Sequence, residues 1–191
     1  MGQRFEDLFL PYVEAAYRLA RFIVRDPIAA DDIVQESFLR ALRFFGSYRG
    51  GDAKSWLLTI VRNCSFDWSK SNRRVVGIAS DTATADMALS YEITVGDSFR
   101  DSLGRWIPSP DSLGADQDGP ETTLLRQSEI AEVRAMIDRL PEPFRETLVL
   151  RELEELSYKQ IAQVTSVPLG TVMSRLARAR HLLICQMERR Q

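Results

Sequence analysis

Three arginines lie within six residues near the end of the chain, at Arg175, Arg178 and Arg180. A guanidinium group can fork onto a guanine edge or neutralise a phosphate, and both contacts are common in DNA-binding proteins. If this stretch is helical, Thr171, Ser174 and Arg178 share one face. Arg175 and Arg180 then flank that face. Small polar residues beside one reaching arginine suit a helix lying in the major groove. A solvated amphipathic helix is the alternative interpretation.

The surrounding sequence predicts two helices joined by a short turn. Ser157 and Gln160 have the spacing of a capping box, so a helix should begin at Ser157, with Lys159 in its first turn. Pro168 then begins a second helix that extends to about residue 188. The apolar positions that face its buried side are Val172, Leu176, Ala179 and Leu183. A capped short helix followed by a proline-containing turn favours a helix-turn-helix over a merely solvated helix.

Aromatic, glycine and basic residues are mixed in the segment FFGSYRGGDAKSW, residues 44–56. Unstacked bases bind aromatic rings and pockets, and a nucleic-acid backbone binds cations, so this composition suits single-stranded nucleic acid. We expect Tyr48 to be the free aromatic residue and most of the others to lie in the core. Asp52 can cap a helix that extends to about residue 72. The residues opposite its apolar face are Thr59, Arg62, Phe66, Lys70 and Arg73.

Two earlier helices are also predicted. The spacing of apolar residues indicates one helix over residues 4–24, and Asp26-Pro27 has the residue types of a second helix start. The apolar positions of the second helix are Val34, Phe38, Ala41/Leu42 and Phe45. Its polar residues include Asp31, Asp32, Gln35 and Glu36. Acidic residues in a first turn complement the helix dipole, which is sufficient to explain them.

Charge is distributed unevenly along the chain. The formal net charge is −2, but residues 75–124 carry nine acidic residues and two arginines, a balance of −7. Residues 1–74 and 125–191 are both mildly basic. Helical periodicity is lost between 75 and 124, so we expect two all-α domains joined by a long, acidic, largely irregular linker. Its acids either oppose non-specific DNA binding or keep a soluble tether extended, and the sequence leaves both interpretations open.

Several other classes of protein are excluded by composition. No apolar run approaches the roughly 18 residues of a membrane span, and no secretory signal is visible, so we expect a cytoplasmic protein without membrane insertion. The two cysteines, Cys64 and Cys185, provide no disulfide framework. The sequence contains no evident phosphate-binding glycine loop, metal-ligand cluster or nucleophile–base pair. We therefore predict no catalytic residues, metal or cofactor.

Two long segments resemble bacterial RNA polymerase sigma factors of the sigma-70 family, in the extracytoplasmic-function (ECF) group. DDIVQESFLRALRFFGSYRG and WLLTIVRNCSFDWSKSNRR resemble the second conserved region of that group. LPEPFRETLVLRELEELSYKQIAQVTSVPLGTVMSRLARAR resembles the fourth. The resemblance implies that residues 1–74 form a region 2-like domain and residues 125–191 a region 4-like domain, with 75–124 between them.

The resemblance also implies roles for particular residues. Core polymerase, through its clamp and flap regions, and promoter DNA are the implied partners, and an anti-sigma factor is a further one. The implied clamp-binding residues are Asp31, Asp32, Gln35 and Glu36. The implied contacts to the −10 element are Tyr48, Asp52, Lys54, Arg62, Asn63, Lys70 and Arg73. The implied contacts to the −35 element are Lys159, Thr171, Ser174, Arg175, Arg178 and Arg180.

One position departs from the family pattern. The family usually has Glu-Gly-Leu-Ser-Tyr where this chain has Glu154-Glu155-Leu156-Ser157-Tyr158, so a turn with positive φ at Glu155 would be strained. The predicted function is a promoter-specificity subunit that recognises the −10 and −35 elements and promotes strand opening. The alternative is a polymerase-independent helix-turn-helix regulator that binds duplex DNA.

Overall fold

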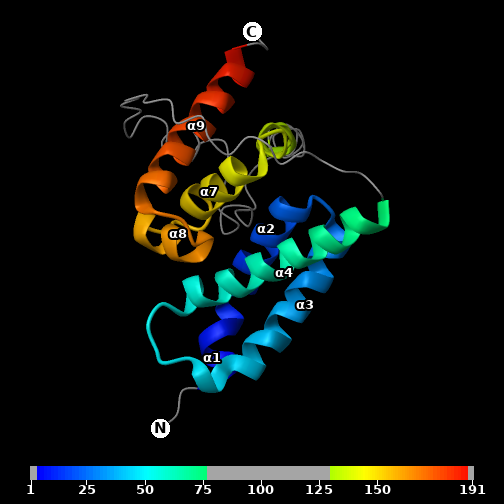
Figure 1. Cartoon of the computed structure of the whole chain (residues 1–191), viewed down its shortest axis with the longest axis vertical. Helices are drawn as coiled ribbons and strands as arrows, with labels where there is room; N and C mark the ends of the chain where they lie inside the picture. Colours follow the sequence, from blue (N-terminus) through cyan, green and yellow to red (C-terminus); the bar gives the residue numbers. More distant parts are fainter. Residues whose placement is uncertain (1–3, 77–129, 189–191) are drawn as a thin grey trace, which may run out of the picture.

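The computed structural model describes residues 4–76 and 130–188 (Figure 1). All of the regular structure in these two ranges is helical, which confirms the predicted all-α fold. The first range contains α1 (Phe5–Phe9), the 3₁₀ turn η1 (Leu10–Tyr12), α2 (Val13–Val24), α3 (Pro27–Phe44), the 3₁₀ turn η2 (Phe45–Ser47) and α4 (Ala53–Val76). The second contains a helix over 130–138, then α7 (Glu142–Glu152), α8 (Tyr158–Thr165) and α9 (Leu169–Glu188). The expected acidic linker lies almost entirely outside the described residues.

Capping side chains set the starts of two helices as predicted. The Asp26 carboxylate accepts hydrogen bonds from the backbone N–H groups of Ile28, at 2.9 Å, and Ala29, at 3.3 Å, so α3 begins at Pro27. Ser157 and Gln160 form the predicted capping box at the start of α8.

The prediction of a single helix over residues 4–24 is wrong. Pro11 lacks a backbone N–H and lies in the 3₁₀ turn that separates α1 from α2.

The core of the first domain is formed by α2, α3 and α4. Its fully buried side chains include Phe9, Leu19, Leu57, Leu58 and Val61. From the spacing of apolar residues we expect Leu57, Ile60, Val61, Cys64 and Trp68 to share the buried face of α4; Leu57, Val61 and Cys64 are buried, and Ile60 and Trp68 are half-buried. The alternative between Ala41 and Leu42 is resolved, because Ala41 is fully buried and Leu42 is exposed.

The core of the second domain lies between the 130–138 helix, α7, α8 and α9. Its largest fully buried side chains are Ile137, Leu140, Leu148, Leu150, Ile161 and Leu176. The predicted buried side of α9 is confirmed, since Val172, Leu176, Ala179 and Leu183 are all buried. Ser166 adopts the left-handed conformation, with φ 55°, and ends α8 before the turn into α9.

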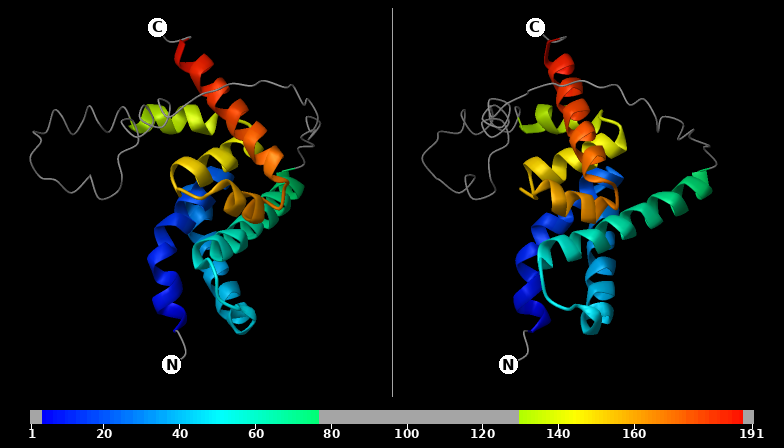
Figure 2. Two further views of the ribbon diagram at one scale, coloured as in Figure 1. Left: turned by 90° about the vertical axis from the view of Figure 1, so that its left-hand side faces the viewer. Right: turned by 60° about the vertical axis from the view of Figure 1, so that its left-hand side comes forward.

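The two domains pack against each other (Figures 1 and 2). Helix α8 lies against α4, and α7 lies against α2. At the second contact the buried guanidinium of Arg145 donates hydrogen bonds to the carbonyl oxygens of Leu140, at 2.8 Å, and of Ile23 in α2, at 3.4 Å. Burial, together with the nearby charge of Arg25, lowers the pKa of Arg145 to about 10, so this side chain is still cationic at neutral pH. None of the helices in residues 4–76 and 130–188 is long and apolar enough to cross a membrane.

Glu155 has the strained backbone that we predicted from its replacing the glycine usual in the family. Its φ is 55°, in the left-handed region that glycine adopts without a steric penalty. This residue lies in the bend between α7 and α8, so the strain is located where the helix-turn-helix begins. A non-glycine residue in this conformation costs about 1–2 kcal/mol.

Glu155→Gly is therefore expected to stabilise the protein. Relief of strain is partly offset by the greater unfolded-state entropy of glycine, about 0.4–1 kcal/mol, so the net gain should be up to about 1 kcal/mol. Thermal unfolding should show a Tm rise of about 2–4 °C for a chain of this size. Glu155→Ala is the matched control, because it removes the same side chain but keeps the strain. Equal stabilisation by both variants would show that backbone strain is not the cause.

Candidate nucleic-acid interface

The face of α9 that is open to solvent carries two of the predicted −35 residues. Ser174 and Arg178 are exposed, and the Ser174 hydroxyl donates a hydrogen bond of 3.0 Å to the carbonyl oxygen of Thr171. Thr171 and Arg175 are only half-exposed. Lys159 in α8 is exposed. The helix-turn-helix thus presents a small hydroxyl and one long cation on the same surface.

Arg180, which we also predicted at the −35 element, has a structural contact in this conformation. Its guanidinium lies 2.7 Å from a carboxylate oxygen of Glu152, and the two side chains are only 16% and 5% exposed. This ion pair ties α9 to the end of α7. A DNA contact by Arg180 would compete with it.

Tyr48 is not free, and our expectation for this residue is wrong. Its ring stacks on Phe45 with an interplanar angle of 14° and lies 5.2 Å, between ring centroids, from Trp56. Its hydroxyl donates a hydrogen bond of 2.8 Å to the carbonyl oxygen of Gly51. The apolar ring is therefore half-buried on the aromatic cluster around Phe9, and the hydroxyl fastens the loop.

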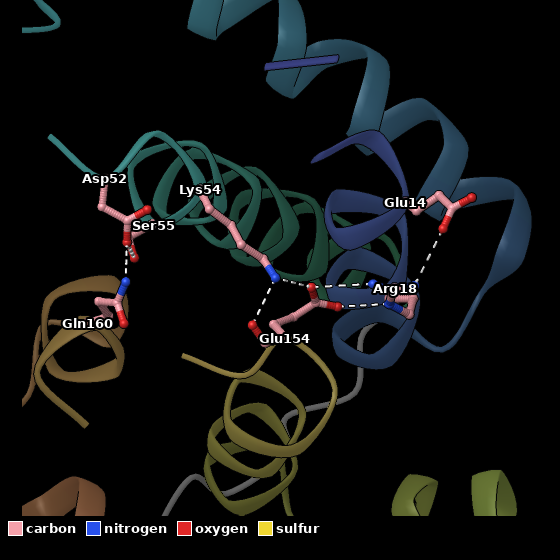
Figure 3. Close-up of polar contacts among 7 residues, drawn as sticks. All are labelled: Glu14, Arg18, Asp52, Lys54, Ser55, Glu154 and Gln160. Carbon is pink, nitrogen blue, oxygen red and sulfur yellow. Dashed lines mark hydrogen bonds and ion pairs between the residues drawn. The ribbon is translucent and has the colours of Figure 1, made fainter. Parts of the chain in front are cut away.

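The loop ends at Asp52, whose carboxylate connects the two domains. The Ser55 hydroxyl and the side-chain amide of Gln160 in α8 both donate hydrogen bonds to it (Figure 3). Burial opposes ionisation of Asp52, but the hydrogen bonds from Ser55 and Gln160 outweigh it, so the pKa of this carboxyl is lowered. Asp52 is therefore ionised at neutral pH and held against the helix-turn-helix.

A second carboxylate, Glu154, is fully buried between cations of the other domain (Figure 3). Its two oxygens lie 2.8 Å from Arg18 Nε and 2.9 Å from Lys54 Nζ. Lys54 also donates a hydrogen bond of 2.8 Å to the Glu154 carbonyl oxygen. Because a buried charge is tolerated only when it is paired, Glu154 fixes where α2 and α4 meet the bend that follows α7.

A third contact across the domain boundary joins Arg62 in α4 to Glu146 in α7. The Arg62 guanidinium donates a hydrogen bond to the Glu146 carboxylate and lies 4.6 Å from the centroid of the Phe66 ring. Burial raises the pKa of Glu146, although Arg62 acts in the opposite direction. Of the other predicted −10 residues, Asn63 and Lys70 are exposed, whereas the side chain of Arg73 lies outside the described part of the chain.

The four predicted polymerase contacts lie along α3. Asp31, Asp32, Gln35 and Glu36 are all exposed, and Glu36 forms an ion pair of 2.7 Å with Arg40. Sequence analysis did not identify the exposed apolar residues of the same helix, of which Ile28, Leu39 and Leu42 are 75%, 55% and 53% exposed. Together with Asp31 and Gln35 they lie on one side of the helix. Apolar residues spaced among polar residues on the face that should meet solvent were therefore the sequence signal for this surface.

Comparisons with known proteins match both domains. Residues 8–75 match the family model for Sigma-70 region 2, and residues 130–183 match the model for Sigma-70, region 4. The chain is 33% identical to the RNA polymerase sigma-H factor of Pseudomonas aeruginosa, over 94% of this chain and 83% of that protein. It is 34% identical to the ECF RNA polymerase sigma-E factor of Haemophilus influenzae, over 86% and 77% of the two chains.

Two solved structures share the fold. The sigma factor RpoE from Bartonella quintana, solved with the anti-sigma factor NepR, aligns with a TM-score of 0.65 and 21% identity over 96% of both chains. CnrH, solved with the cytosolic domain of CnrY, aligns with a TM-score of 0.60 and 18% identity over 98% of this chain and 89% of that one.

Glu154→Gln tests the contact between the domains. The amide keeps the shape of the side chain but leaves Arg18 and Lys54 without their carboxylate, so unfolding stability should fall by about 1–3 kcal/mol in chemical denaturation. Spin-label or fluorophore distances between α4 and α9 should also lengthen or broaden. Glu155→Gln is the control, because it changes the same charge at the adjacent exposed position. Unchanged distances in Glu154→Gln would contradict the role of Glu154 in holding the domains together.

Proposed function

Because this chain belongs to the ECF group of sigma-70 factors, and is thus a promoter-specificity subunit of bacterial RNA polymerase, we propose how its surfaces divide that work. The exposed face of α9 binds the −35 element as duplex. The loop around Tyr48–Asp52 and the basic side of α4 bind the −10 element as it opens. The exposed stripe on α3 binds core polymerase.

The observation that carries the −35 assignment is the exposed pair Ser174 and Arg178 on a capped helix-turn-helix. Arg178 has the reach to fork onto a guanine edge, and Ser174 can donate to or accept from a base. We propose that Lys159 in α8 and Arg175 in α9 neutralise phosphates of the same duplex.

Three of the proposed −10 residues need a change of arrangement before they can bind DNA. Asp52, Lys54 and Arg62 all contact the second domain here, through Gln160, Glu154 and Glu146. We propose that this closed arrangement belongs to the protein without polymerase and that separation of the domains on core polymerase releases these side chains. Glu154→Gln should then bind a single-stranded −10 oligonucleotide more tightly than the unaltered free protein does.

For the polymerase contact, the exposed stripe of α3 provides both charge and apolar area. Ile28, Leu39 and Leu42 are available to be buried, and Asp32 and Gln35 lie among them. Interfaces gain most of their affinity from a few buried side chains of this kind, with polar neighbours setting orientation.

The fold neighbours solved with NepR and CnrY support an anti-sigma partner for this chain as well. A cytoplasmic location follows from action on RNA polymerase, and we assign no catalytic residue.

Run-off transcription tests the function directly. Core polymerase supplied with the full chain and a promoter library should yield products that depend on this protein. A helix-turn-helix regulator that acts without joining polymerase would instead bind duplex DNA and leave core polymerase inactive on the same templates.

Arg178→Ala should weaken binding to the selected −35 duplex by about 1–3 kcal/mol and relax the preference at one base pair. Arg175→Ala should weaken binding nearly equally for all sequences and reduce the salt dependence, as loss of a phosphate contact does. Binding titrations against single-base variants of the duplex, at several salt concentrations, distinguish the two. Identical profiles for both variants would refute the assignment of the faces.

Leu39→Lys should reduce affinity for core polymerase about tenfold or more, because it places a charge in the buried part of that interface. The fold should be preserved, since Leu39 is already exposed. Leu10→Lys is the matched control: Leu10 is equally exposed, at 55%, but belongs to the η1 turn and not to the α3 stripe. Equal polymerase affinity of the two variants in a pull-down titration would argue against the α3 stripe.

A further inference from the structure

The side-chain amide of Gln160 forms hydrogen bonds at both of its ends. Its Oε1 atom accepts one from the backbone N–H of Ser157, at 2.7 Å, and one from the Ser157 hydroxyl, at 2.6 Å. These bonds belong to the capping box at the start of α8. Its Nε2 atom donates to the carboxylate of Asp52, which lies across the domain boundary (Figure 3). One amide therefore connects the start of the helix-turn-helix to the end of the loop around Tyr48–Asp52.

Both partners of this contact are held in place by their own domains. The two donors of Ser157 bind the amide oxygen of Gln160, so its N–H2 group is left to point toward Asp52. On the other side, Asp52 Oδ2 also accepts a hydrogen bond from the Ser55 hydroxyl, and the backbone N–H groups of Lys54 and Ser55 donate to the same carboxylate. Because neither side chain has to be newly ordered, the contact forms at little cost in conformational entropy.

We infer that Gln160 is an autoinhibitory residue, whose amide keeps the loop that ends at Asp52 from binding the opened −10 strand. This rests on the proposed function, in which that loop binds the strand and the closed arrangement belongs to the protein without polymerase. While Gln160 donates to Asp52, this carboxylate oxygen is occupied and α8 lies against α4. The strand reaches the carboxylate only after the amide has left it.

The contact depends on glutamine in particular. A capping box takes either glutamine or glutamate at this position, because both present an oxygen to the start of the helix. Only glutamine carries a hydrogen-bond donor at the other end of the same group. Glutamate would place a second carboxylate oxygen against Asp52 with no hydrogen between the two anions, and like charges at such a separation repel. The cap alone does not require glutamine, whereas the contact between the domains does.

Gln160→Glu tests the inference, because it keeps the cap and removes the donor. While the closed form dominates, the apparent affinity for a ligand of the open form is proportional to the fraction of open protein. The free full-length chain should therefore bind a single-stranded −10 oligonucleotide about tenfold more tightly, as expected for loss of a hydrogen bond to a charged group. Gln163→Glu is the matched control: it makes the same change at an exposed position of the same helix and should leave the affinity unaltered.

A second background reverses the expected sign. In Asp52→Asn the introduced side-chain oxygen still caps α4, since asparagine and aspartate are equivalent at an N-cap, and its N–H2 group is free to face the second domain. Adding Gln160→Glu to this variant re-forms the contact with donor and acceptor exchanged. Oligonucleotide binding should then weaken about threefold or more, relative to Asp52→Asn alone. Spin-label distances between α4 and α9 should shorten in that background and lengthen in the other.

The inference is overturned if Gln160→Glu leaves the oligonucleotide affinity unchanged, or if it shifts the affinity in the same direction in both backgrounds. A lost cap or a damaged fold acts alike in both, so the reversal of sign separates the contact from misfolding. Run-off transcription by core polymerase with the unaltered chain is measured alongside. Run-off products without the reversal overturn only this inference. Absence of run-off products overturns the proposed function together with it.

Discussion

The arrangement of this protein depends on one buried carboxylate. Glu154 is fully removed from solvent, and an unpaired charge in such a place would cost many kcal/mol. Arg18 and Lys54 compensate it, and they come from α2 and α4 of the other domain. The bend that carries Glu154 also contains the strained Glu155 and leads directly into α8. One short segment therefore determines both how the domains meet and where the helix-turn-helix begins.

The contacts across this boundary combine ion pairs with apolar packing, because the buried hydrophobic side chains of both domains form one continuous cluster. When the domains separate, the loss of an ion pair costs less free energy if the cation then pairs with another anion. Apolar surface that becomes exposed has no such compensation. Lys54 and Arg62 meet carboxylates in the closed arrangement, and a DNA backbone offers phosphates of the same charge sign. Under the proposed −10 assignment, Glu154 and Glu146 occupy these two cations in the closed arrangement, and promoter DNA would have to replace them. Burial raises the pKa of Glu146, which means that its ionised form is less favourable here than in water.

Local features of the fold were predictable from the sequence, and contacts between distant segments were not. The caps at Asp26 and Ser157 and the buried stripe of α9 each depend on residues a few positions apart, so their spacing was sufficient to predict them. Glu154 stands in a run with Glu152 and Glu155 that resembles any solvated acidic segment. Its burial depends on partners 100 and 136 residues away. Tyr48 was misjudged for the same reason, because its ring packs on Phe9.

In the candidate site, too, local spacing was sufficient for some features and contacts with other helices determined the rest. Helical spacing predicted which residues of α9 are buried, but the exact centre of the open face depends on how α7 and α8 pack against it. Arg175 lies near Glu146 of α7, and Arg180 pairs with Glu152 of the same helix, so both are drawn toward the protein. The three arginines that first indicate DNA binding therefore differ in what they can contact, and Arg178 alone of the three is exposed.

The closed arrangement also bears on how an acidic protein with basic surfaces avoids indiscriminate DNA binding. Each cation that reaches a phosphate releases counterions, so non-specific affinity rises with the number of available cations whatever the sequence. In the described residues Lys54, Arg62 and Arg180 are all paired with carboxylates, whereas Ser174 and Arg178 stay open. In the proposed assignment, pairing removes Lys54 and Arg62 from the −10 side and Arg180 from the −35 side, and it leaves Ser174 and Arg178 accessible. Under the proposed assignment of surfaces, the second domain limits non-specific binding by the first. The same proposal gives an order of promoter recognition, in which duplex contact needs no rearrangement and contact with the opened strand needs the domains to separate.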